Sequence, residues 1–223
     1  MTTPIRVVIC LLAVLAAAAP VFAAPLTFTA SGIVTAAQSP FALNDPFTLT
    51  VTVDSDTPNL LDNSNVGLYA LSSLTLEIGD AFVATSSGGF VEVQNAKPDL
   101  FGVVVTSAEG LTATQMDGKT VHFFQFFVKQ SLGMLIDSNA LPTTQRTLLG
   151  DGSFMDLRSC TAFSGSVMAG SVCSGVSGAS GIASAAEIGP ADPTVVPEPA
   201  SMTLLGVGLA GLGARRWRQR GKC

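Results

Sequence analysis

Residues 47–53 read Phe-Thr-Leu-Thr-Val-Thr-Val, so that apolar side chains alternate strictly with threonine. Successive side chains of a β-strand point to opposite faces of a sheet, and this alternation is typical of a strand with one buried and one solvated face. Valine, phenylalanine and threonine also favour strands intrinsically. The segment therefore predicts a half-buried strand within an antiparallel sheet.

The same period of two continues on both sides of this segment, and turn-forming residues interrupt it. Gly79-Asp80 and Asp117-Gly118 each lie between two apolar segments, at 74–78 and 81–85 and at 111–116 and 119–128, as two-residue hairpin turns do. Further strands are predicted at 26–35, 90–93, 100–106, 153–157 and 162–168. About nine or ten short strands with turns between them predict an all-β domain, either an antiparallel β-sandwich or a jelly roll.

The stretch 121–128 differs because it is apolar on both faces, which predicts a central strand buried on both sides. It contains His122, the single histidine of the chain, which we interpret as a core residue. The predicted ectodomain covers 24–178. Residues 179–195 are rich in Ser, Gly, Ala and Pro and predict a flexible linker, although the early part of this segment could still form a last strand.

The N-terminus has the three regions of a secretory signal peptide. Arg6 precedes an uncharged run at 7–19, and Pro20 interrupts the helix. Small or apolar residues then lead to a predicted cleavage site after Ala23. The run is too short for a membrane span. Residues 1–23 therefore predict a removable signal helix and export through the Sec translocon.

The C-terminus carries three ordered elements. Pro197, Glu198 and Pro199 are followed by an apolar run at 202–214 and then by a cluster of arginines: Arg215, Arg216, Arg218 and Arg220. As a helix, 200–214 would reach about 22 Å against a hydrocarbon core of about 30 Å, so it predicts a short transmembrane helix. The positive-inside rule keeps the arginines in the cytoplasm and the large acidic segment outside.

These three elements at 196–223 resemble the PEP-CTERM sorting signal of Gram-negative bacteria. The resemblance implies that an exosortase, an integral-membrane transpeptidase-like cysteine protease, recognises Pro197, Glu198 and Pro199. It implies that 202–214 enters the inner membrane and that the arginines stop transfer. It further implies removal of the tail, delivery to the cell surface or extracellular matrix, and an association with exopolysaccharide and biofilm.

The segment 24–196 is strongly acidic, with 15 acidic side chains against five basic ones and a net charge of −10. Such a charge repels phosphate backbones and anionic lipid surfaces, which argues against a nucleic-acid partner. Divalent cations remain as small partners, and Asp54, Asp56 and Asp62 are the candidate calcium ligands. The alternative is a solvated loop of turn-forming residues.

Cysteine usage agrees with export. Cys10 and Cys223 lie in segments expected to be removed, which leaves Cys160 and Cys173 as one pair. Ser164-Gly165-Ser166 between them allows the chain to turn back, so this pair predicts a disulfide.

The sequence carries few signs of catalysis. It has one histidine and contains no Gly-x-Ser-x-Gly motif, and zinc sites require clusters of His and Cys. We therefore expect an exported surface or matrix structural protein with no enzymatic activity and no cofactor, calcium excepted. Two alternatives remain: a carbohydrate-binding or carbohydrate-cleaving module, and a periplasmic protein that stays anchored in the membrane.

Overall fold

The alternating segment forms strand β2 (Pro46–Asp54), and its two faces differ as the pattern predicts. Phe47, Leu49 and Val51 are buried, whereas the threonines between them are exposed or half-buried. The structure is a computed structural model that describes residues 25–190, except 117, 132–135, 149–151 and 175–176. The predicted signal helix at 1–23 with its cleavage site after Ala23, and the predicted transmembrane helix, lie outside the described residues.

The described residues form β-strands and one short 3-10 helix. Beside β2, the elements are β1 (Pro25–Ala37), β3 (Val66–Ala70), β4 (Ser73–Ile78), β5 (Phe82–Ser86), β6 (Phe90–Gln94), β7 (Asp99–Thr106), η1 (Ser107–Glu109), β8 (Thr112–Ala113), β9 (Val121–Gln130), β10 (Arg146–Thr147), β11 (Gly152–Ser159), β12 (Ala162–Ser166), β13 (Gly170–Ser174) and β14 (Ser177–Pro190). No helix in this part of the chain is long and apolar enough to cross a membrane.

The all-β, antiparallel prediction is confirmed. The strands do not divide into two separate large sheets, as a sandwich would require, because one sheet runs in the order β3-β6-β7-β9-β11-β14-β1-β2-β4-β5-β8. Strand β10 adds to this sheet by pairing with β14, and β12 and β13 form a small second sheet. The main sheet curls strongly into a half-barrel, so its two halves face each other.

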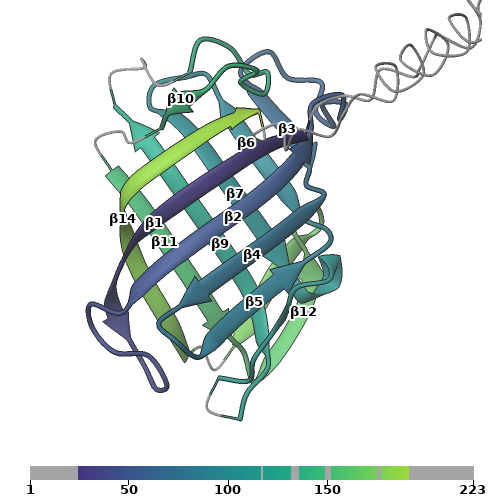
Figure 1. Ribbon diagram of the computed structural model, residues 1–223. Helices are drawn as coiled ribbons and strands as arrows, with labels where there is room; N and C mark the ends of the chain where they lie inside the picture. Colours follow the sequence, from purple (N-terminus) through teal and green to yellow (C-terminus); the bar gives the residue numbers. More distant parts are fainter. Residues whose placement is uncertain (1–24, 117, 132–135, 149–151, 175–176, 191–223) are drawn as a thin grey trace, which may run out of the picture. The chain divides into compact units, whose positions relative to one another are not determined.

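Figure 1 shows the consequence of this curl: β1, β2, β4 and β5 form a front layer that crosses over β6, β7, β9 and β11 behind it. Strand β14 joins the layers, since it pairs with β11 near its start and with β1 along most of its length. The pairing of β1 with β14 shifts between Ser31 and Gly32 and again between Val34 and Ala36. Such bulges bend a strand, and here they fall where the sheet turns from one layer to the other.

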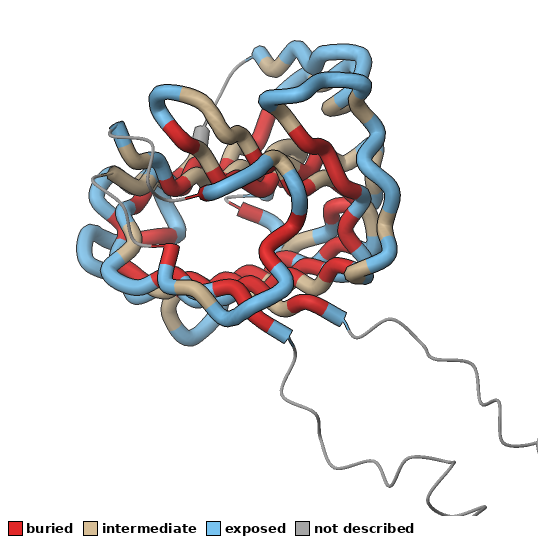
Figure 2. Tube along the Cα trace, turned by 90° about the horizontal axis from the view of Figure 1, so that it is seen from above, coloured by how far each residue is buried: buried red, intermediate tan, exposed pale blue. Residues whose placement is uncertain are grey.

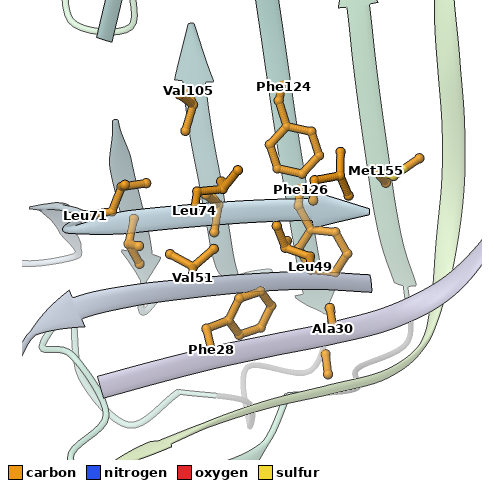
Figure 3. Packing of buried hydrophobic residues seen from close by; sticks show 14 of the residues in the cluster. Phe28, Ala30, Leu49, Val51, Leu71, Leu74, Val105, Phe124, Phe126 and Met155 are labelled. Atoms are coloured by element: carbon orange, nitrogen blue, oxygen red, sulfur yellow. The ribbon is translucent and has the colours of Figure 1, made fainter. Parts of the chain in front are cut away.

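The core fills the space between the two layers (Figure 3). The ring of Phe28 on β1 lies 4.9 Å from the ring of Phe101 on β7 and 5.5 Å from that of Phe126 on β9, measured between centroids. The ring of Phe47 also approaches Phe126, at 6.4 Å. Figure 2, seen from above, shows buried residues in the strands among half-buried and exposed ones. Apolar contacts between rings on different layers therefore hold the curled sheet closed.

The predicted flexible linker at 179–195 is wrong over most of its length, because 179–190 belongs to β14. This strand pairs with both β1 and β11, so it is central and not peripheral. The predicted ectodomain boundary at 178 consequently falls inside a strand. Small residues suit this position: a Cβ atom on Gly178 would lie 1.9 Å from the carbonyl oxygen of Leu157. The small residues that suggested a linker instead allow the backbone of β14 to pack closely against its neighbours.

The first predicted hairpin forms, whereas the second is limited to the two residues that flank its turn. Ile78 pairs with Phe82, so the first turn has three residues, Gly79 to Ala81, and not two. In the second, Met116 and Lys119 exchange backbone hydrogen bonds of 3.0 and 2.9 Å, but β8 then pairs with β5. This second hairpin is therefore closed only at its tip. The strand predicted at 162–168 ends at Ser166, and the turn falls after it.

Strand β9 is central, between β7 and β11, as its apolar pattern predicts. The prediction that both of its faces are buried is correct for one face only. Phe124, Phe126 and Val128 point into the core and are fully buried. Phe123 and Phe127 point to the outer side of the layer and are half-buried.

Candidate functional site

The outer face of β9 and β11 combines aromatic and polar side chains. In the register, Phe127 lies opposite Phe154, Gln125 opposite Asp156, and Phe123 opposite Arg158. These alternate residues share one face of the sheet because side chains on a strand alternate. Phe154 is 42% exposed. The two strands therefore present a strip that is aromatic at both ends and polar in the middle.

The polar residues of this strip form one connected group. The Gln125 amide Nε2 donates to Asp156 Oδ2 at 3.3 Å, and the Arg158 guanidinium pairs with the same oxygen at 2.5 Å. The guanidinium carbon also lies 5.3 Å from the centre of the Phe123 ring, within reach of a cation–π contact. The Asp156 side chain is 11% exposed and that of Arg158 is 40% exposed. A largely buried carboxylate is thus neutralised by a cation that still faces solvent.

A shallow hollow of about 250 Å³ adjoins this group. Asp156 and Arg158 form one side of it, small residues of β14 (Gly178, Ala179 and Ser180) form its floor, and the end of β1 at Ala36 and Ala37 forms the other side. The hollow exists because these side chains are short where the sheet bends from one layer to the other. The strip and the hollow together, defined by Phe123, Gln125, Phe127, Phe154, Asp156, Arg158 and Gly178, are called the outer site below.

The prediction that His122 is a core residue is not met, because the residue is half-buried and lies outside the buried core cluster. Its Nδ1 atom lies 3.0 Å from the Ser107 hydroxyl, and its ring stacks on Phe163 of β12 at 5.2 Å with an interplanar angle of 2°. The carboxylate of nearby Glu109 closes the capping box of η1 with Thr106 and accepts from the Val167 amide at 3.0 Å. These contacts dock the β12–β13 hairpin onto η1 and β9. The Ser107–His122 pair is therefore part of a packing contact.

The predicted disulfide is confirmed. Cys160 and Cys173 are bonded, with their Cα atoms 5.4 Å apart. Cys160 precedes β12 and Cys173 lies in β13, so the bond closes the base of the hairpin that covers His122.

The predicted calcium ligands are not brought together. Asp54 ends β2, and its Oδ1 atom accepts a hydrogen bond of 3.1 Å from the Asp56 backbone amide. Asp62 lies in the following loop, and within the described residues no group of three His, Cys, Asp or Glu side chains could hold a metal. The carboxylate of Asp54 instead stabilises the turn after β2, as aspartate commonly does. The alternative, a solvated loop, fits the geometry.

Sequence reasoning missed the outer site. Its residues are ordinary strand residues, and they become neighbours only through the pairing of β9 with β11 and of β11 with β14. The available signal was the alternation of Phe154 and Asp156 within the strand predicted at 153–157, with Arg158 directly after it. That alternation gives the shared face but not the partner strand.

The sorting elements lie beyond the described residues, and a comparison with protein families identifies them. The model of the PEP-CTERM protein-sorting motif matches residues 195–219. The matched range includes Pro197, Glu198 and Pro199 and the arginines Arg215, Arg216 and Arg218, whereas Arg220 follows it. Neither the curated proteins nor the solved structures contain a match to this chain. The chain therefore carries a C-terminal PEP-CTERM sorting motif and is an exported protein, directed to the cell surface and processed by an exosortase.

Proposed function

We propose that this chain is a non-enzymatic structural protein of the cell surface or extracellular matrix, linked to exopolysaccharide, which its tail delivers there. The observation that carries the proposal is the position of the sorting motif. Strand β14 ends at Pro190 and the matched motif begins at residue 195. Four residues separate the last strand from the motif, so the sheet domain is the principal part of the chain left to act after processing.

Two features of the domain support a structural role. The Cys160–Cys173 disulfide braces a surface hairpin, which is typical of proteins that function outside the cytoplasm. The single histidine packs between Ser107 and Phe163 and serves the attachment of that hairpin. Both features stabilise the domain.

The first test is the intact mass of the native protein in separated membrane, periplasmic and extracellular fractions, with and without reductant. The expected surface form lacks residues 1–23 and everything beyond the Pro-Glu-Pro region. Reductant supplies two electrons and opens the disulfide, so two hydrogen atoms are added, one each at Cys160 and Cys173. A strain lacking the protein is expected to lose surface matrix. A Glu198→Ala variant should retain its tail, because the recognition element is changed.

The opposite result has a definite meaning. A mass that retains 202–223 in the membrane fraction of the unmodified strain would refute processing. The protein would then be a permanently anchored periplasmic protein. Normal matrix in the deletion strain would refute the structural role while leaving the sorting intact.

A further inference from the structure

The aromatic part of the outer site can contact a ligand with apolar faces. Phe127 and Phe154 are direct neighbours across β9 and β11, and Phe123 lies on the same face four residues away along β9. Alternate residues of a strand are about 6.6 to 6.8 Å apart, so the rings extend over more than 10 Å. Phe154 is exposed and the other two rings are half-buried, which leaves part of each ring accessible. An elongated ligand fits this spacing better than a small molecule does.

The polar part of the outer site favours an uncharged partner. Asp156 and Arg158 neutralise each other, and Gln125 adds an amide that bonds to Asp156. Arg158 keeps N–H donors facing solvent, since its side chain is 40% exposed, and an amide supplies both a donor and an acceptor. A ligand with many hydroxyl groups can use both kinds of group. An anionic ligand would meet the Asp156 carboxylate and a segment with a net charge of −10, from 15 acidic and five basic side chains at 24–196.

The hollow adds space for a ligand beside the polar group. Its floor has no large side chain, because Gly178 lies opposite Arg158 and Ser180 opposite Asp156 in the register. Its volume of about 250 Å³ lies just below the usual range for small-molecule pockets, and it is shallow. A groove of this kind accommodates one unit of a polymer whose neighbouring units continue over the rings.

We propose that the outer site binds an uncharged polysaccharide, with sugar rings packed on Phe123, Phe127 and Phe154 and hydroxyl groups bonded to Gln125 and Arg158. This assignment rests on the proposed function, because it names the matrix component that the delivered domain would hold. The assignment also places the polysaccharide contact on the outer face of β9 and β11. The rest of the sheet surface remains available for other contacts.

The test measures binding of the full-length protein, solubilised in detergent, to laminarin, galactomannan and dextran by isothermal titration calorimetry, with alginate as an anionic comparison. At least one neutral polymer should bind saturably, with little dependence on salt. Phe154→Ala should weaken that binding about tenfold, as truncation of an exposed aromatic contact does. The double variant Asp156→Asn/Arg158→Gln should also weaken it, and it leaves no buried charge without a partner.

The matched control is Val83→Ala on β5, which removes an apolar side chain with a similar exposure of 43% from the other layer. It should bind like the unmodified protein, and the unfolding transition of each variant shows that it is folded. Failure of all three neutral polymers to bind, preferential binding of alginate, or unchanged binding by folded Phe154→Ala would each overturn the proposal. Recovery of the protein in the matrix fraction is measured separately, so loss of the binding site and loss of the structural role can be distinguished.

Discussion

At the scale of single residues, Gly102 shows how closely the back layer is packed. It lies opposite Phe127 in the register, and a Cβ atom at this position would be 2.2 Å from the Phe127 ring. A Gly102→Ala variant must displace that ring. We expect a loss of about 1 to 3 kcal/mol in the free energy of unfolding, measured by urea denaturation.

The control for this prediction is Gly152→Ala, at another position on the same face. There the added atom would lie 3.1 Å from Cε of Lys129, which is exposed and can move aside. This variant should be near neutral. Equal losses in both variants would show that the change in strand propensity, and not the Phe127 ring, determines the cost.

Glu92 on β6 gives a pH-dependent prediction. It lies between Leu68 and Gly102 in the register, and burial raises the pKa of its carboxyl above the ordinary value of 4.5. The folded state therefore holds this proton more tightly than the unfolded state, and ionisation destabilises the fold. Glu92→Gln removes that penalty, so the variant should be more stable than the unmodified protein at neutral pH.

The gain should shrink as the pH falls through the raised pKa and vanish below 4.5, where both states are protonated. Urea unfolding at a series of pH values measures it. The control is Glu77→Gln at an exposed position on β4, which should show no comparable gain. A gain for Glu92→Gln that does not depend on pH would contradict the assigned cause.

At the scale of elements, the β12–β13 hairpin depends on its disulfide. The bond joins residues 13 apart in sequence and holds the hairpin whose Phe163 stacks on His122. Replacing both Cys160 and Cys173 by serine should lower the free energy of unfolding by about 3 kcal/mol in the loop-entropy model. Thermal or urea unfolding measures this. Cys223→Ser is the control and should change nothing, and an unaffected midpoint in the double variant would contradict the brace.

The elements that sequence predicted well are those with a strong local signal. Alternating threonines defined β2, and glycine turns placed the β4–β5 hairpin to within one residue. Most of strand β14 was predicted as a linker, although its early part was also considered as a last strand, because its residues are small and small residues have no periodic apolar pattern. Its partners β1 and β11 determine its structure, and tertiary contacts of that kind override local propensity.

The candidate sites also divide into those with a local sequence signal and those formed only by tertiary contacts. The Cys160–Cys173 bond was predictable because only two cysteines lie between the two terminal segments. The outer site was not, because Gln125 and Asp156 are 31 residues apart and meet only through the strand register. The candidate calcium ligands are close in sequence, but the Asp54 carboxylate bonds to the Asp56 backbone amide and no three acidic side chains of the described residues could hold a metal.

At the scale of the whole molecule, the first and last strands of the described domain are paired. Leu26 on β1 lies opposite Pro190 on β14, and β14 also bonds to β11. The sheet order has β14 between the two layers, so without it β1 and β11 would each have an unpaired edge. Unpaired edges promote aggregation, and pairing of such distant residues delays folding until the chain is complete.

This topology predicts that the domain folds only if the chain includes β14. A chain that ends at residue 176 lacks β14 and should be insoluble or without a cooperative unfolding transition. A chain that ends at residue 191 keeps all the strands of the described residues and should unfold cooperatively. Both are expressed from residue 24 in the periplasm, where the disulfide can form, and compared by sedimentation and by circular dichroism during urea denaturation. The comparison controls for loss of the sorting tail, which both chains lack. A soluble, cooperatively folded chain ending at 176 would show that β14 is added to a sheet that is stable without it. The domain could then fold before export of the C-terminal part of the chain is complete.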